Sequence, residues 1–120
     1  MPTPSGHTNA IRASRVIGTT VYSPSGDKIG EVEDIVLEKT SPEISFAVVG
    51  FGGLLGIGEK YHPLPWSMLD YDDERDGYVV AVSKDQLEKA PADSIKELTK
   101  DDGSKAREAC YSYYNIPLRS

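Results

Sequence analysis

The sequence predicts a mainly β domain, either a small barrel or a sandwich, followed by a short helical segment. Between residues 14 and 82, roughly six short segments rich in β-branched and aromatic residues alternate with turns of glycine, proline, serine and aspartate. From residue 83 onward the apolar residues follow helical spacing. The chain has 120 residues, which suits one domain with one modest core. We divide it into a flexible N-terminal tail (1–13), a β domain (14–90) and a helical C-terminal extension (91–120).

The extended segments are expected at residues 16–22, 28–38, 44–50, 61–66, 68–71 and 78–82. A turn cluster at 23–27 joins the first two segments, and an acidic turn at 72–77 joins the last two as a hairpin. In the second segment Val32 and Ile35 are three positions apart, whereas strict alternation needs an even interval. A β-bulge near residues 33–34 would absorb this slip and bend the strand.

Two of these segments carry more specific signals. The alternation within residues 44–50 predicts a strand with one apolar face. In residues 61–66, Pro63 and Pro65 cannot donate backbone hydrogen bonds, which favours a strand end or an edge position. The apolar face of the segment at 44–50 consists of Ile44, Phe46 and Val48.

The C-terminal part of the chain predicts short helices. Ser83 and Gln86 have the spacing of a capping box, which opens a helix that ends before Pro91. Another turn or two of helix is expected within residues 93–98, and a longer helix within 104–114. The aromatic side of the last helix supplies three candidate protein-contact residues, Tyr111, Tyr113 and Tyr114.

Composition and charge narrow the function classes. The net charge is −6, and most of the acidity lies in residues 15–90, which argues against direct binding of a nucleic-acid backbone. The single cysteine rules out an internal disulfide and a thiolate zinc cluster. We find no basic and apolar leader and no run of about 18 apolar residues. We therefore expect a cytoplasmic protein with no membrane insertion.

The residues of the β region resemble the PRC-barrel domain over about residues 14–90. The segment from the glycine-rich loop to Pro65 and Trp66 is the most specific part, and residues 113–117 are similar to a tail of some stand-alone bacterial members. The positions that carry the resemblance are Ile17, Gly18, Val21, Gly26, 28–30, Val32, Asp34, 48–60, Pro65 and Trp66.

The resemblance implies a small, highly bent, mostly antiparallel β-barrel, and we expect the C-terminal helices to form a short appendage to it. The same barrel occurs in the cytoplasmic part of the photosynthetic reaction-centre H subunit and in the C-terminal half of a ribosome-maturation factor. The family function is docking onto larger assemblies, and the family has no catalytic residues to carry over. A non-catalytic protein-binding or scaffolding module is therefore expected. The resemblance also leaves two alternatives, a ribosome-maturation or RNA-processing factor acting through protein contacts and an accessory of an electron-transport complex.

The glycine-rich loop at residues 50–58 is a candidate contact site. Glu59 occupies the place where a phosphate-binding loop needs lysine, so we interpret the glycines as permitting tight bends at a barrel corner. The apolar residues of the loop either fold down as a lid on the core or form an exposed contact patch. These residues are Phe51, Leu54, Leu55 and Ile57. The structural set comprises Gly30, Gly50, Gly52, Gly53, Gly56, Gly58 and the plug residue Trp66.

Other chemistry-bearing residues give no site. The acidic turn fits the start of a calcium-binding loop, but Ser83 occupies the position that must supply a bidentate carboxylate. We interpret it as a solvated hairpin tip, with weak cation binding left open. His62 and Cys110 are interpreted as structural residues, and we expect no cofactor and no metal. The expected partners are one or more proteins, and a homodimer is one such arrangement.

Overall fold

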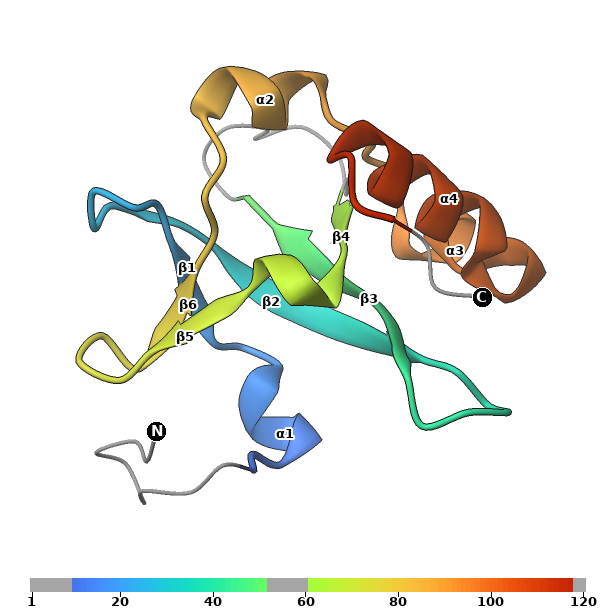
Figure 1. Cartoon of the computed structure of the whole chain (residues 1–120), viewed down its shortest axis with the longest axis horizontal. Coiled ribbons are helices and arrows are strands. Elements are labelled where there is room, and N and C mark those ends of the chain that lie inside the picture. Colours follow the sequence, from blue (N-terminus) through green and yellow to red (C-terminus); the bar gives the residue numbers. More distant parts are fainter. Residues whose placement is uncertain (1–9, 52–60, 118–120) are drawn as a thin grey trace.

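The computed structural model describes residues 10–51 and 61–117. Six strands form one sheet in the order β4-β3-β2-β1-β6-β5, and short helices surround it (Figure 1). The strands are β1 (Thr20–Tyr22), β2 (Lys28–Leu37), β3 (Ile44–Gly50), β4 (His62–Leu64), β5 (Asp70–Asp72) and β6 (Gly77–Val79). The helices are α1 (Ala13–Val16), α2 (Lys84–Lys89), α3 (Ile95–Leu98) and α4 (Ser104–Tyr113), with 3-10 turns η1 (Trp66–Met68) and η2 (Lys100–Gly103).

The sheet is mixed: most of its strand pairs are antiparallel, as expected, and one pair is parallel. β1 and β6 run parallel, with Val21 beside Tyr78, whereas the other neighbouring strands are antiparallel. A parallel pair needs a long crossover, and here the chain supplies it by passing through β2 to β5 before it returns. Within the described residues β4 and β5 are the two edges and do not pair with each other. The hydrogen-bonded sheet is therefore open in this part of the chain.

β2 is the longest strand and it bends. The register with β3 shifts between Val32 and Asp34, which confirms the predicted bulge. At this point a carboxylate oxygen of Asp34 accepts a hydrogen bond from the backbone N–H of Ile35 at 2.8 Å. β2 pairs with β1 near its start and with β3 over the rest of its length. The bend therefore lies where β2 passes from one pairing partner to the other.

The first predicted strand is wrong at its N-terminal end. Val16 closes α1 and is buried, and the strand begins only at Thr20. Between them Gly18 has φ of +93° and donates its N–H to the carbonyl of Val32 at 2.7 Å. Val16 is β-branched, but burying its side chain under the sheet outweighs the preference of that side chain for a strand. Three further segments are shorter than predicted: the strand expected at 61–66 is β4 (His62–Leu64), Met68 lies in η1, and β6 ends at Val79.

The C-terminal helices begin and end largely as predicted. In α2 the hydroxyl of Ser83 accepts from the N–H of Gln86 at 3.1 Å, and the Gln86 side chain accepts from the N–H of Ser83 at 2.9 Å. The capping box is therefore confirmed. The last helix reaches Tyr113, and Asn115 then adopts φ of +60°, which ends the helix.

β3 is buried on both faces, although the alternation predicted only one. Ala47 and Val49 face the main core, a cluster that also includes Val21, Leu64 and Val80. Phe46 and Val48 face a second cluster that includes Leu98 and Cys110. The second cluster joins β3 to α3 and α4, which lie on one side of the sheet (Figure 1). The helical C-terminal extension thus shares a core with the sheet.

Candidate interaction surfaces

The predicted C-terminal contact residues mainly hold the molecule together. The hydroxyl of Tyr111 donates to the carbonyl of Ser45 in β3 at 3.2 Å, and that of Tyr113 donates to the carbonyl of Gln86 in α2 at 2.6 Å. Tyr114 packs against both clusters, and burial raises the pKa of its hydroxyl. Tyr111 and Tyr114 are therefore half-buried and pack within the molecule, and their role as contact residues stays a prediction. Tyr113 alone among the three is exposed.

One apolar residue of the glycine-rich loop, Phe51, belongs to the main core. Phe51 is 1 % exposed, and its ring meets the His62 ring edge to face with the ring centres 5.1 Å apart. Phe51 is therefore a core residue, as the lid interpretation expects, and does not belong to an exposed patch. The remaining loop residues of the prediction lie outside the described residues; they are Gly52, Gly53, Leu54, Leu55, Gly56, Ile57 and Gly58.

Three residues of the predicted structural set lie in the described part of the chain: Trp66, Gly30 and Gly50. Trp66 packs against the main core, and its ring meets the Tyr78 ring edge to face with the ring centres 5.7 Å apart. Gly30 and Gly50 lie where β2 and β3 approach closely: a Cβ on Gly30 would stand 2.2 Å from the carbonyl oxygen of Gly50. A side chain at position 30 is thus excluded by the backbone of the neighbouring strand.

The histidine and the cysteine of the described region are buried. Burial lowers the pKa of His62, and a backbone hydrogen bond with Pro91 partly offsets this effect. Burial raises the pKa of Cys110 to about 12. A thiol that stays protonated at neutral pH is a poor nucleophile and a poor metal ligand, which supports the structural interpretation of Cys110.

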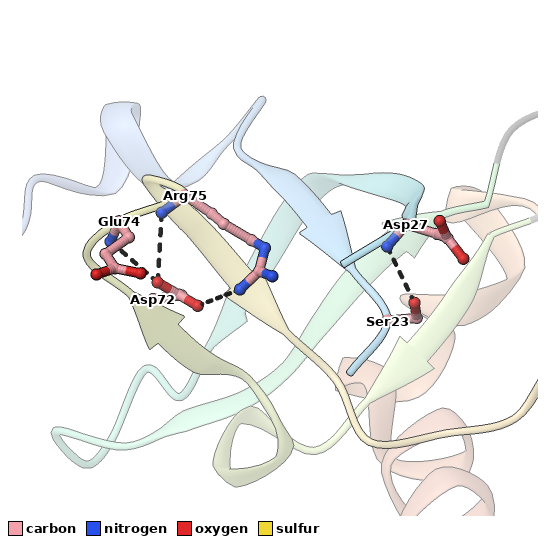
Figure 2. A network of polar contacts seen from close by, with 5 residues as sticks. All are labelled: Ser23, Asp27, Asp72, Glu74 and Arg75. Atoms are coloured by element: carbon pink, nitrogen blue, oxygen red, sulfur yellow. Dashed lines mark hydrogen bonds and ion pairs between the residues drawn. The ribbon is translucent and has the colours of Figure 1, made fainter. Parts of the chain in front are cut away.

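The acidic β5–β6 turn is shaped by its own carboxylate. Asp72 accepts hydrogen bonds from the backbone N–H groups of Glu74 and Arg75 at 2.9 and 3.3 Å, and pairs with the Arg75 guanidinium at 2.7 Å (Figure 2). These contacts, first among them the backbone hydrogen bond of Arg75, lower the pKa of Asp72. The guanidinium also lies over the Tyr22 ring, 5.9 Å from its centre. Because Asp72 and Arg75 engage each other, the outward-facing charge of the turn comes from its other carboxylates.

The neighbouring β1–β2 turn is also closed by a side chain of the turn itself, here a serine hydroxyl. The Ser23 hydroxyl accepts from the backbone N–H of Asp27 at 3.2 Å (Figure 2), and the Asp27 carbonyl accepts from the N–H of Ser23 at 2.8 Å. Both turns are thus closed by local side-chain contacts. In residues 10–51 and 61–117 no three metal-ligating side chains come together.

Large apolar side chains are exposed at places that the sequence analysis did not single out. Leu37 is 59 % exposed at the end of β2, opposite Ile44, on the hairpin that extends away from the sheet (Figure 1). Ile11 and Ile17 flank α1 and are 47 % and 42 % exposed. Because Leu37 continues an apolar strand and Ile17 was assigned to a strand, local pattern gave no sign that either side chain would face solvent.

The chain belongs to the PRC-barrel family. A family model described as the PRC-barrel domain matches residues 8–87, which is most of the chain and includes every strand of the sheet. No curated protein matches the chain. In the described part of the chain, no helix has the length and apolar character needed to cross a bilayer. The resemblance noted from the sequence is thereby confirmed at the level of the family.

Proposed function

We propose that this chain is a non-catalytic protein-binding module that docks onto another protein through the projecting β2–β3 hairpin. Membership of the PRC-barrel family supports an interaction module as the class of function. The observation that carries the proposal is Leu37, the most exposed of the large apolar side chains in the described residues. Burying a leucine side chain contributes about 1.5–3 kcal/mol, so a partner that covers Leu37 gains affinity from it.

The surroundings of Leu37 suit a protein contact. Val36 is partly buried against the second cluster, so the strand is held in place up to the residue before Leu37. The turn beyond it carries Glu38, Lys39 and Glu43, which place charges of both signs around one apolar side chain. An apolar centre with a polar rim is the arrangement found at many protein interfaces.

Affinity purification from native expression, read by mass spectrometry, tests this function. The chain is compared with Leu37→Glu and with the control Thr40→Glu, which adds the same charge at the exposed hairpin turn but removes no apolar side chain. We expect Leu37→Glu to lose its partners and Thr40→Glu to keep them, with both variants folded by circular dichroism. An identical partner set for all three proteins would contradict the proposal.

The same experiment separates the alternatives implied by the family. Ribosomal proteins among the Leu37-dependent partners, with co-sedimentation on ribosomal subunits, would favour the ribosome-associated role. Subunits of an electron-transport complex would favour the accessory role. A non-catalytic role and a cytoplasmic location are parts of this proposal.

A further inference from the structure

α1 and its flanking residues form a basic surface on an acidic protein. Arg12 and Arg15 are exposed, and neither forms an ion pair with another described residue. Ile11 and Ile17 beside them expose nearly half of their surface. We call these four residues the basic α1 surface. Two guanidinium groups that form no ion pair within residues 10–51 and 61–117, next to exposed apolar side chains, suit a partner that offers carboxylates.

The β5–β6 turn offers such carboxylates. In this turn Asp72 is held by Arg75, and Asp76 accepts a hydrogen bond from the Tyr71 hydroxyl. Asp73 and Glu74 lie at the tip, and within residues 10–51 and 61–117 their side chains form no ion pair. We call these two residues the acidic tip. Because the Arg75 guanidinium pairs with Asp72 and lies over the Tyr22 ring of β1, the charge that remains at the tip is that of Asp73 and Glu74.

We propose that two copies of this chain associate through a symmetric contact in which the basic α1 surface of each copy faces the acidic tip of the other. In a twofold interface the same patch occurs on both copies, so each patch must contain both complementary parts. α1 and the β5–β6 turn meet this condition, since both lie in the lower half of Figure 1, away from α2 and α4. The exposed isoleucines supply the apolar part of the contact.

This inference rests on the proposed binding role and names a second copy as the occupant of a surface other than Leu37. A second copy fits better than an anionic membrane, because a net charge of −6 repels an anionic surface as a whole. Two copies repel each other in the same way at long range, so their contact needs local pairing of opposite charges. The chain itself carries both charge types in the required places.

The contact should depend strongly on charge and on salt. Sedimentation equilibrium measures the dissociation constant of the dimer, which we expect to rise at least tenfold in Arg12→Glu/Arg15→Glu and in Asp73→Lys/Glu74→Lys. The control Lys39→Glu/Lys105→Glu makes the same charge change as the α1 variant, but at exposed positions elsewhere. It should change the dissociation constant little. Raising the salt from about 0.05 M to about 0.5 M should weaken the wild-type dimer, because the Debye length shortens.

Mixing the two reversed proteins gives the sharpest test. Each alone has lost both contacts, but in a mixed dimer the introduced glutamates face the introduced lysines, and the native arginines face the native carboxylates. The mixture should therefore recover dimer mass, and failure to recover it would overturn the proposal. If the turn variant does not fold by circular dichroism, an unchanged dissociation constant in the α1 variant decides against the proposal.

The tests of self-association and of docking through Leu37 can fail independently of each other. A chain that is monomeric at all concentrations but captures partners through Leu37 loses only the self-association. A dimer that captures no Leu37-dependent partner loses only the docking function. Binding of the wild-type chain to vesicles of anionic lipid, abolished by Arg12→Glu/Arg15→Glu and without dimerisation, would assign the basic α1 surface to a membrane and overturn the proposal.

Discussion

Replacing Gly30 by alanine tests whether the close approach of β2 and β3 is a requirement of the fold. The new Cβ would stand 2.2 Å from the carbonyl oxygen of Gly50 and 3.0 Å from the Phe51 ring, whereas ordinary contact begins at 3.4 Å. Both obstacles belong to the packed interior: one is backbone, and the Phe51 side chain is fully buried. Relief requires the two strands to separate locally, which disturbs the core beneath them.

The size of the effect follows from two opposing contributions. Forcing an extra methyl group into a packed interior costs about 1–3 kcal/mol. Replacing glycine lowers the entropy of the unfolded chain, which returns about 0.4–1 kcal/mol where the backbone conformation suits alanine. The free energy of unfolding of Gly30→Ala should therefore fall by about 1–2 kcal/mol. For a chain of this length that lowers the melting temperature by about 4–8 °C.

Gly50→Ala is the matched control on the facing strand. Its Cβ would meet the Glu33 side chain at 3.0 Å and the Tyr61 ring at 3.3 Å, and the flexible Glu33 side chain can move aside. Urea denaturation and calorimetry of both variants should show a clear loss for Gly30→Ala and a change within about 0.5 kcal/mol for Gly50→Ala. Equal stability of the two variants would refute the argument that strand spacing excludes a side chain at position 30.

Three further outcomes are expected. Burial holds the pKa of His62 below its usual 6.5, so the unfolded chain takes up a proton at a higher pH than the folded chain does. The contribution of His62 to stability should therefore be full above about pH 6.5 and should fall as the pH drops towards the folded-state pKa. In denaturation measured from pH 7.5 to 5, His62→Phe should flatten this dependence, and an unchanged slope would contradict it. Cys110 should react with iodoacetamide at pH 8 far more slowly in the native protein than in urea, since its pKa is raised to about 12, and equal rates would show that the thiol is accessible. Tyr113→Phe removes the hydrogen bond to Gln86 and should cost about 0.5–1.5 kcal/mol of stability by thermal denaturation; no loss would show that α4 is not tied to α2 by this contact.

For the candidate site residues, the structure shows which parts of the molecule they pack against. Aromatic residues at helical spacing indicated a surface for protein contact, but the rings of Tyr111 and Tyr114 pack α4 against β3. Phe51 packs in the main core, which agrees with the lid interpretation. Leu37 was not singled out, because exposure depends on where the sheet ends and not on the residue itself. An apolar side chain gives the same local signal whether its partner belongs to the same chain or to another.

The sequence by itself determined the features whose cause lies within a few residues. The capping box of Ser83 and Gln86, the bulge after Val32 and the turns between strands each depend on local side-chain contacts or on the phase of alternation. The resemblance to the PRC-barrel family could also be noted from the order of residues in the glycine-rich and neighbouring segments.

Only the tertiary structure decided which elements lie side by side. The parallel pairing of β1 with β6, the burial of β3 on both faces and the helical state of Val16 follow from contacts between segments far apart in the chain. The free energy of such contacts depends on the area buried by all the partners together, which no single segment specifies. For the same reason, which apolar side chains remain exposed for a partner was settled by the packing of the whole chain.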